Sequence, residues 1–177
     1  STMASSDSNG LLMGSIYSMG ASRQLVGQFP TQKSSKSVDA ITSLLTEKIV
    51  PKLPTQNHRR TLTHSNNEYH YKVSGEHVFI CIAKSEAQKR VCWAFIDDME
   101  NYVLQNGTRD LRSFIRDKLE YYNNPNNDKI NSLKRKIDDV KDVMIDNIDK
   151  LLERGEELDS LLQKTNDLAD DSYIYRG

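Results

Sequence analysis

The architecture of this chain follows from residues 130–175, which read INSLKRKIDDVKDVMIDNIDKLLERGEELDSLLQKTNDLADDSYIY. Apolar side chains recur there at alternating steps of three and four residues, separated mostly by Asp, Glu, Lys and Asn. The stripe consists of Ile130, Leu133, Ile137, Val140, Met144, Asn147, Leu151, Arg154, Leu158, Leu161, Thr165, Leu168, Ser172 and Tyr175. A mean step of about 3.5 residues holds one narrow seam toward partner helices along a supercoil, whereas an ordinary domain helix has a wider stripe. We therefore expect this segment to bind other helices.

One arginine, Arg154, interrupts the seam near its middle. A guanidinium inside a helical bundle is costly unless its donors are satisfied, so it penalises every alignment that leaves it among leucines. The alternative is a solvated arginine on an ordinary helix face, but its position between Leu151 and Leu158 argues against this. The sequence therefore predicts that Arg154 sets the register of a helical assembly.

Length, charge and cysteine content limit the class of protein. The 177 residues allow one compact domain plus an extended element. A formal net charge of -1 gives no overall basic field, so we expect no nucleic-acid partner. Cys81 and Cys92 lie in apolar surroundings without metal-ligand spacing, which indicates reduced core cysteines of a cytosolic protein.

The first 125 residues show the patterns of a folded domain. Expected strands are residues 11–19, 24–29, 60–64, 68–73 and 77–83, the last three forming an antiparallel meander. Expected helices are residues 37–53, 84–105 and 111–122, with Ser37 and Ser85 as the first two N-caps. This order predicts a five-stranded sheet covered by three helices, an α+β fold.

Individual residues in both halves match one known family. Residues 151–158 (LLERGEEL) resemble the core of the R-SNAREs around their central arginine, and residues 146–149 (DNID) and 164–168 (KTNDL) resemble the endolysosomal subtype. Residues that resemble the strands and second helix of a longin domain are 61–64 (TLTH), 69–71 (YHY), 78–82 (VFICI) and 90–103 (RVCWAFIDDMENYV). The chain is thus similar to a longin-type R-SNARE of the vesicle-associated membrane protein (synaptobrevin) family.

This resemblance implies a domain plan. It implies a longin (profilin-like) domain with an antiparallel sheet at residues 11–122, a linker at 123–128, and a coiled-coil R-SNARE motif at 129–177 that is disordered or folded back when unpartnered. Residues 1–10 are expected to be a disordered tail or a remnant of cloning. The sequence reaches Gly177 without a hydrophobic anchor or prenylation cysteine, so we expect the membrane anchor outside these residues.

The resemblance also implies a function. Three Q-SNARE helices would join the seam in a four-helix bundle, their glutamines completing the layer of Arg154. Zippering would then draw vesicle and target membranes together, at the cytoplasmic face of vesicle, endosomal, lysosomal or vacuolar, or secretory membranes. The longin domain would regulate assembly or bind trafficking adaptors. If the motif folds back, we expect the groove between the 38–49 helix and the 60–64 strand to receive it.

A second interpretation is a longin-domain trafficking adaptor or exchange-factor subunit that oligomerises through an ordinary coiled coil. Such a coiled coil usually has Glu/Lys pairs beside its seam and lacks a lone central arginine.

Other chemistry is not indicated. No nucleophile or phosphate-binding motif is present, so we expect no enzyme activity and no cofactor. The four histidines lack the spacing of a helical metal site, although His64 and His70 would be neighbours if their strands aligned suitably. Residues 97–100 look like solvated charge on a helix face, and residues 58–60 (HRR) like a polar loop.

Overall fold

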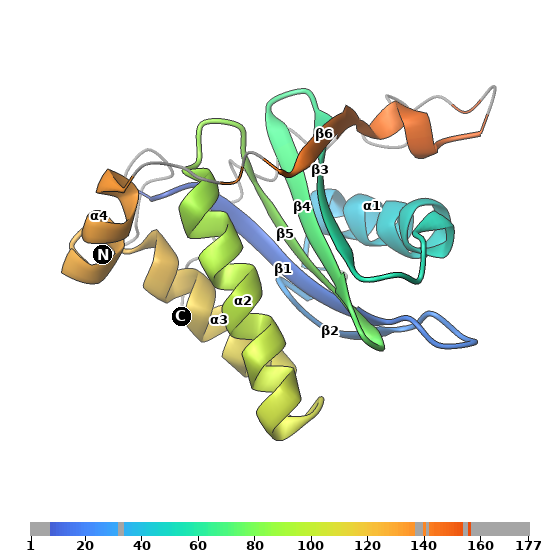
Figure 1. Cartoon of the computed structure of the whole chain (residues 1–177), viewed down its shortest axis with the longest axis horizontal. Coiled ribbons are helices and arrows are strands. Elements are labelled where there is room, and N and C mark those ends of the chain that lie inside the picture. The colour runs from blue at the N-terminus through green and yellow to red at the C-terminus, as the bar shows by residue number, and fades with distance from the viewer. Residues whose placement is uncertain (1–7, 32–33, 137–139, 141, 154–155, 157–177) are drawn as a thin grey trace.

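The computed structural model describes residues 8–31, 34–136, 140, 142–153 and 156. A six-stranded sheet with the order β2-β1-β5-β4-β3-β6 forms its centre, with α1 on one face and α2 and α3 on the other (Figure 1). The strands are β1 (Leu11–Ser18), β2 (Leu25–Phe29), β3 (His58–His64), β4 (Asn67–Ser74), β5 (His77–Lys84) and β6 (Met144–Asn147). The helices are α1 (Lys36–Leu44), α2 (Lys89–Asn106), α3 (Leu111–Asn123) and α4 (Asp128–Arg135), with shorter turns η2 (Leu45–Ile49), η3 (Val50–Lys52) and η4 (Ile148–Leu151).

The first five strands pair antiparallel, as expected from the sequence. Successive side chains of a strand point to opposite faces of a sheet, and both faces here are apolar. Tyr17, Tyr71 and Leu62 are buried in the cluster beneath α1, whereas Ile16 and Cys81 are buried in the cluster beneath α2 and α3. The α+β prediction is confirmed, but the sheet has six strands and not five, because residues 144–147 add one.

Close contact between β1 and the two long helices depends on Gly14. A Cβ atom at this position would lie 2.6 Å from Phe95 Cζ and 2.7 Å from Ile115 Cγ2. Real Cβ atoms essentially never approach so closely, so any larger residue would push α2 and α3 away from the sheet.

Both predicted N-caps are wrong. The side chain of Ser35, and not that of Ser37, accepts a hydrogen bond from the Val38 N–H at 3.1 Å, while Ser37 is buried. Helix α2 begins after Gln88, because Ser85 donates its backbone N–H to Asn66 and the chain turns before the helix starts. A serine near the start of a helix acts as an N-cap only where the backbone places an unpaired N–H group within hydrogen-bonding distance of its hydroxyl.

Three further expectations are corrected. Residues 58–60 belong to β3 and not to a loop. Asp97, Asp98 and Glu100 are not simply solvated, since Lys72 binds Asp97 and Glu100 and the Tyr122 hydroxyl donates to Asp98. His64 pairs with Asn67 in the β3–β4 ladder, whereas His70 pairs with Thr61, so the two histidines are not opposite each other.

The prediction of buried, reduced cysteines is confirmed. Cys81 and Cys92 are buried and free of any disulfide. Within the described residues, no group of three or more potential metal ligands occurs, and no helix there is long and apolar enough to cross a membrane.

Candidate functional site at the edge of the sheet

The described residues between 128 and 156, which we call the tail, fold back onto the described part of the first 123 residues. Its first element is α4, which is capped by Asn127. The Asn127 side chain accepts hydrogen bonds from the N–H groups of Lys129 and Ile130. Ile130 is buried against the α2–α3 cluster and Leu133 partly so. The Lys134 ammonium donates to Asn9 Oδ1 at 2.9 Å, which ties the helix to the start of the chain.

The tail then becomes the sixth strand. Strand β6 pairs in parallel with β3, from Arg60 opposite Met144 to Thr63 opposite Asn147. Without it, β3 would be the edge of the sheet, with unpaired backbone donors and acceptors. The pairing satisfies those groups, so the tail completes the sheet.

The tail crosses the sheet edge from one face to the other. Val143, just before β6, is 8% exposed and belongs to the cluster of α2 and α3, whereas Ile148, just after it, is 0% exposed and belongs to the cluster of α1. Leu151 and Leu152 pack partly buried against the α1 cluster. The tail therefore packs against both faces of the sheet at this edge. In Figure 1, α4 and η4 lie toward opposite ends of the longest axis of the molecule, with β6 between them.

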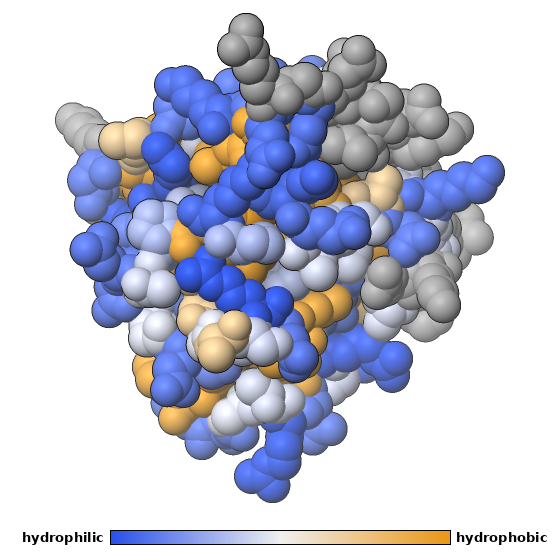
Figure 2. Space-filling view, turned by 90° about the vertical axis from the view of Figure 1, so that its right-hand side faces the viewer, coloured by the Kyte–Doolittle hydropathy of each residue, from blue (hydrophilic) through white to orange (hydrophobic). Residues whose placement is uncertain are grey.

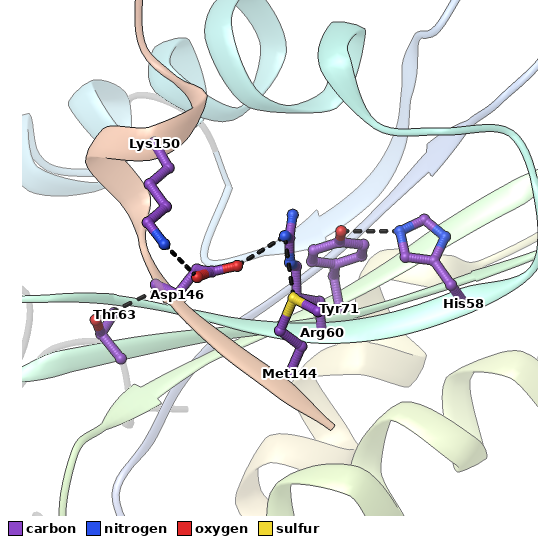
Figure 3. Close-up of polar contacts among 7 residues, drawn as sticks. All are labelled: His58, Arg60, Thr63, Tyr71, Met144, Asp146 and Lys150. Carbon is purple, nitrogen blue, oxygen red and sulfur yellow. Dashed lines mark hydrogen bonds and ion pairs between the residues drawn. The ribbon is translucent and has the colours of Figure 1, made fainter. Parts of the chain in front are cut away.

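Polar contacts flank these apolar anchors. The Arg60 guanidinium lies 2.7 Å from Asp146 Oδ2 and donates to the Met144 sulfur at 3.3 Å, and the Lys150 ammonium donates to Asp146 Oδ1 at 2.9 Å (Figure 3). The hydrogen bond from Lys150, with the charges of Lys150 and Arg60, holds the pKa of Asp146 below its ordinary value. The Tyr71 hydroxyl beside Arg60 bonds to His58 Nε2 at 2.9 Å, and burial raises the pKa of this tyrosine.

A second arginine holds the tail on the other face. Arg59 pairs with Asp142 at 3.0 Å, and its guanidinium carbon lies 5.1 Å from the centre of the Trp93 ring. Trp93 is the only tryptophan of the chain, so its fluorescence reports on this contact.

Beyond β6, two lysines next to α1 contact the tail. Lys48 pairs with Glu156 at 3.4 Å, and the Lys52 ammonium donates to the backbone carbonyl of Leu151. Exposed ion pairs contribute about 0–1 kcal/mol each, whereas full burial of an isoleucine contributes roughly 1.5–3 kcal/mol. The buried apolar residues thus supply most of the affinity of the tail for the longin domain, and the ion pairs fix its position.

Viewed from this end of the molecule, the surface is mostly hydrophilic, with hydrophobic residues in small separate areas (Figure 2).

The seam residues fall into three groups in this structure. Ile130, Leu133, Val140 and Leu151 pack against the domain. Met144 is 60% exposed, and Asn147 is also exposed, its side chain accepting from the Asp149 N–H at 2.8 Å. The seam residues that lie outside the described residues are Ile137, Arg154, Leu158, Leu161, Thr165, Leu168, Ser172 and Tyr175.

Sequence reasoning missed Val143, Ile148 and Leu152 as contact residues. All three are apolar but lie beside the heptad seam, so the helical template did not select them. The sequence feature that pointed to these contacts was the additional apolar residues next to the stripe. The clearest example is the run Val143-Met144-Ile145, which has the composition of a strand.

Comparison with known proteins decides the family. A family model described as "Regulated-SNARE-like domain" (Longin) matches residues 27–119, more than half of the chain. The Synaptobrevin model matches residues 129–177. The chain is a longin-type R-SNARE. Its relatives place it in the vesicle-associated membrane protein 7 subtype.

Those relatives are vesicle-associated membrane proteins of animals and plants. Vesicle-associated membrane protein 7 of Mus musculus is 26% identical over 145 residues, which is 75% of this chain and 66% of that protein. Vesicle-associated membrane proteins 713 and 712 of Arabidopsis thaliana are 28% identical over 149 residues and 29% identical over 158 residues, covering 76% and 81% of this chain and 67% and 71% of those proteins. The chain thus spans about two thirds of the length of these relatives.

The described residues in the first half of the SNARE motif are therefore docked on the longin domain. The predicted groove is confirmed within the described residues: β6 pairs with Arg60–Thr63, and Ile148 joins the cluster of Val38, Ile41 and Ile49. Of the two predicted states of an unpartnered motif, disordered or folded back, the described tail is in the second. Asn123, assigned to the linker from sequence, is the last residue of α3 and is fully buried.

Proposed function

We propose that this R-SNARE zippers with three Q-SNARE helices into a four-helix bundle that drives vesicle membrane fusion, and that its longin domain delays this step by holding the motif. The observation that carries the second part is β6: a segment that must be helical in the bundle is a strand here, with Val143 and Ile148 buried in the longin domain. The two states of the segment exclude each other.

The proposed contact surface in the bundle is the seam. In this proposal the chain has its longin domain at residues 11–122 and its SNARE motif at 129–177. Within the seam, Arg154 faces three glutamines from the partner helices. The apolar and small polar layers on either side are Ile130, Leu133, Ile137, Val140, Met144, Asn147, Leu151, Leu158, Leu161, Thr165, Leu168, Ser172 and Tyr175. At about 1.5 Å per residue, a continuous helix over this range would be roughly 70 Å long, enough to transmit zippering toward the membranes.

The energetic balance favours the bundle over the docked state. Each buried Leu or Ile contributes roughly 1.5–3 kcal/mol, and about ten apolar layers form in the bundle. The docked tail buries only Ile130, Val143 and Ile148 fully. A short tether nevertheless gives the tail an effective concentration on the order of millimolar, so even a weak groove stays filled. Partners then bind at a rate reduced by the open fraction.

The family supports a proposal for the location and the partners of the protein. R-SNAREs are not enzymes, and we propose no catalytic site, metal or cofactor. Vesicle traffic is the general setting; the cytoplasmic face of endosomal, lysosomal or vacuolar membranes is the specific proposal, with anchoring through a segment outside these 177 residues. Trafficking adaptors are proposed as further partners of the longin domain.

The test is reconstitution with three Q-SNARE helices. The full chain should form a detergent- and heat-resistant complex, and a chain beginning at Asn124 should form the same complex faster. A chain that self-associates and does not bind the Q-SNARE helices would support the ordinary coiled-coil alternative, which the family matches disfavour. Equal rates for both chains would remove the restraining role of the longin domain.

A further inference from the structure

Met144 differs from the other described methionines in its exposure. It is 60% exposed on β6, whereas Met13 and Met99 are 0% exposed and Met19 is 7% exposed. Thioether oxidation follows access to the oxidant. Within the described residues, Met144 is thus the sulfur that a dissolved oxidant reaches first, since both cysteines are also fully buried.

The surroundings of Met144 change completely between the two proposed states. In the docked state its sulfur accepts a hydrogen bond from Arg60 Nη2 at 3.3 Å, beside the Arg60–Asp146 pair (Figure 3). A thioether is only a weak acceptor, so this bond is weak. In the bundle the 3-4 spacing puts the same side chain in an apolar layer between Val140 and Asn147.

We propose that Met144 is a redox modification site, at which oxidation to the sulfoxide by hydrogen peroxide favours the docked state over the four-helix bundle. The inference rests on the proposed function. The sulfur gives two electrons to the peroxide, whose O–O bond breaks; one oxygen bonds to sulfur, and the other leaves as water with both protons. Methionine sulfoxide reductases reverse the change.

Both states respond in the same direction. The sulfoxide oxygen is a strong acceptor, and the guanidinium of Arg60 already lies beside it, so a charge-assisted hydrogen bond replaces a weak one. In the bundle, the same oxygen would be buried in an apolar layer without a donor. Oxidised chains should therefore assemble with Q-SNARE helices about tenfold more slowly, a factor that corresponds to about 1.4 kcal/mol.

The experiment uses the full chain carrying Met3→Leu, so that Met144 is the only accessible methionine outside the core. Mild hydrogen peroxide treatment is followed by peptide mass mapping, and assembly with three Q-SNARE helices is timed before and after. Met144→Leu is the matched control, because it keeps an apolar side chain of similar volume and cannot be oxidised. A reductase should restore the original rate of the treated chain.

A second readout isolates the role of Arg60. Amide exchange over residues 144–151, without partners, should slow after oxidation of the chain with Arg60 but not after oxidation of Arg60→Leu. The inference is overturned if Met144 is not the first methionine oxidised, if its oxidation leaves assembly unchanged, or if peroxide slows Met144→Leu equally. If the untreated chain fails to assemble at all, the proposed function fails instead.

Discussion

Neighbouring side chains of one short segment are divided between two interfaces. Val143 and Ile148 are buried in the longin domain, while the seam residues Met144 and Asn147, one position inside each, are exposed. A strand presents every second residue to a face, whereas a heptad helix presents every third or fourth. Residues 143–148 therefore encode two contact surfaces, and substitutions there should affect one surface without the other.

The largest effect is expected from the seam alone. Leu158→Ala with Leu161→Ala should weaken the bundle by several kcal/mol, since each change removes about 2–5 kcal/mol from a packed core. Both residues follow Arg154, so liposomes bearing the protein should still dock while fusion fails. The docked tail should keep its amide protection over residues 144–151. Loss of docking together with fusion would contradict assembly from the membrane-distal end.

The second prediction breaks the other interface. Val143→Ala with Ile148→Ala should open the docked state, because truncating a buried isoleucine alone costs about 2–5 kcal/mol. Assembly with Q-SNARE helices should become at least tenfold faster, and Trp93 emission should shift as Arg59 loses Asp142. Ile145→Ala is the control, because Ile145 lies in the same strand, is 55% exposed and is not a seam residue. An unchanged rate would show that the docked tail does not limit assembly.

The third prediction concerns register. Arg154→Leu should leave bundle formation intact but allow shifted alignments, because an apolar layer would face three polar side chains. Distances between spin labels at Leu133 and Leu168 and labels on a partner should broaden. A single sharp distance, with an unchanged fusion rate, would remove the role of Arg154 in register.

The smallest effect is expected from the charges at β6. The pKa of Asp146 is lowered in the docked state, so its ionised form stabilises docking above the ordinary pKa of the group, and this contribution disappears as pH falls through the lowered value. Docking, followed by Trp93 fluorescence, should therefore weaken in acid below about pH 4. Asp146→Asn should give a few-fold increase in opening at neutral pH and a flatter acid dependence. An identical acid transition in this variant would assign the effect to other groups.

Much of the longin domain was predictable because its patterns are local. The five antiparallel strands lie within two residues of their expected ends, since alternating apolar residues and tight turns specify them. The start of α3 at Leu111 was also predicted, but the N-caps of α1 and α2 were not, because several serines compete as caps and backbone geometry decides between them. Asn123 shows the same limit: its side chain accepts from the Leu11 N–H at 3.0 Å and donates to the Leu11 carbonyl at 2.8 Å, a long-range contact hidden in a linker-like sequence.

Strand β6 was not predictable as a strand. Residues 144–147 fit a heptad helix well, and they are extended only because β3 offers them an unpaired edge. The groove itself could be named from sequence, since β3 was an expected sheet edge beside an amphipathic helix. The residues that fill the groove could not be named from sequence. The heptad pattern includes Met144 and Asn147, whereas the groove is filled by Val143 and Ile148, which lie outside the pattern.

Helix α4 has a consequence for the start of assembly. Forming the first turn of a helix is the improbable step of helix growth, with a nucleation constant of about 10⁻³, whereas each later residue adds easily. Asp128–Arg135 is already helical and capped by Asn127 before any partner arrives. In the proposed assembly, Q-SNARE helices that displace α2 from Ile130 would thus receive a ready nucleus, and growth from it would proceed toward β6. There the advancing helix would have to melt a strand, so initiation would be fast and the first barrier to propagation would lie at the edge of the sheet.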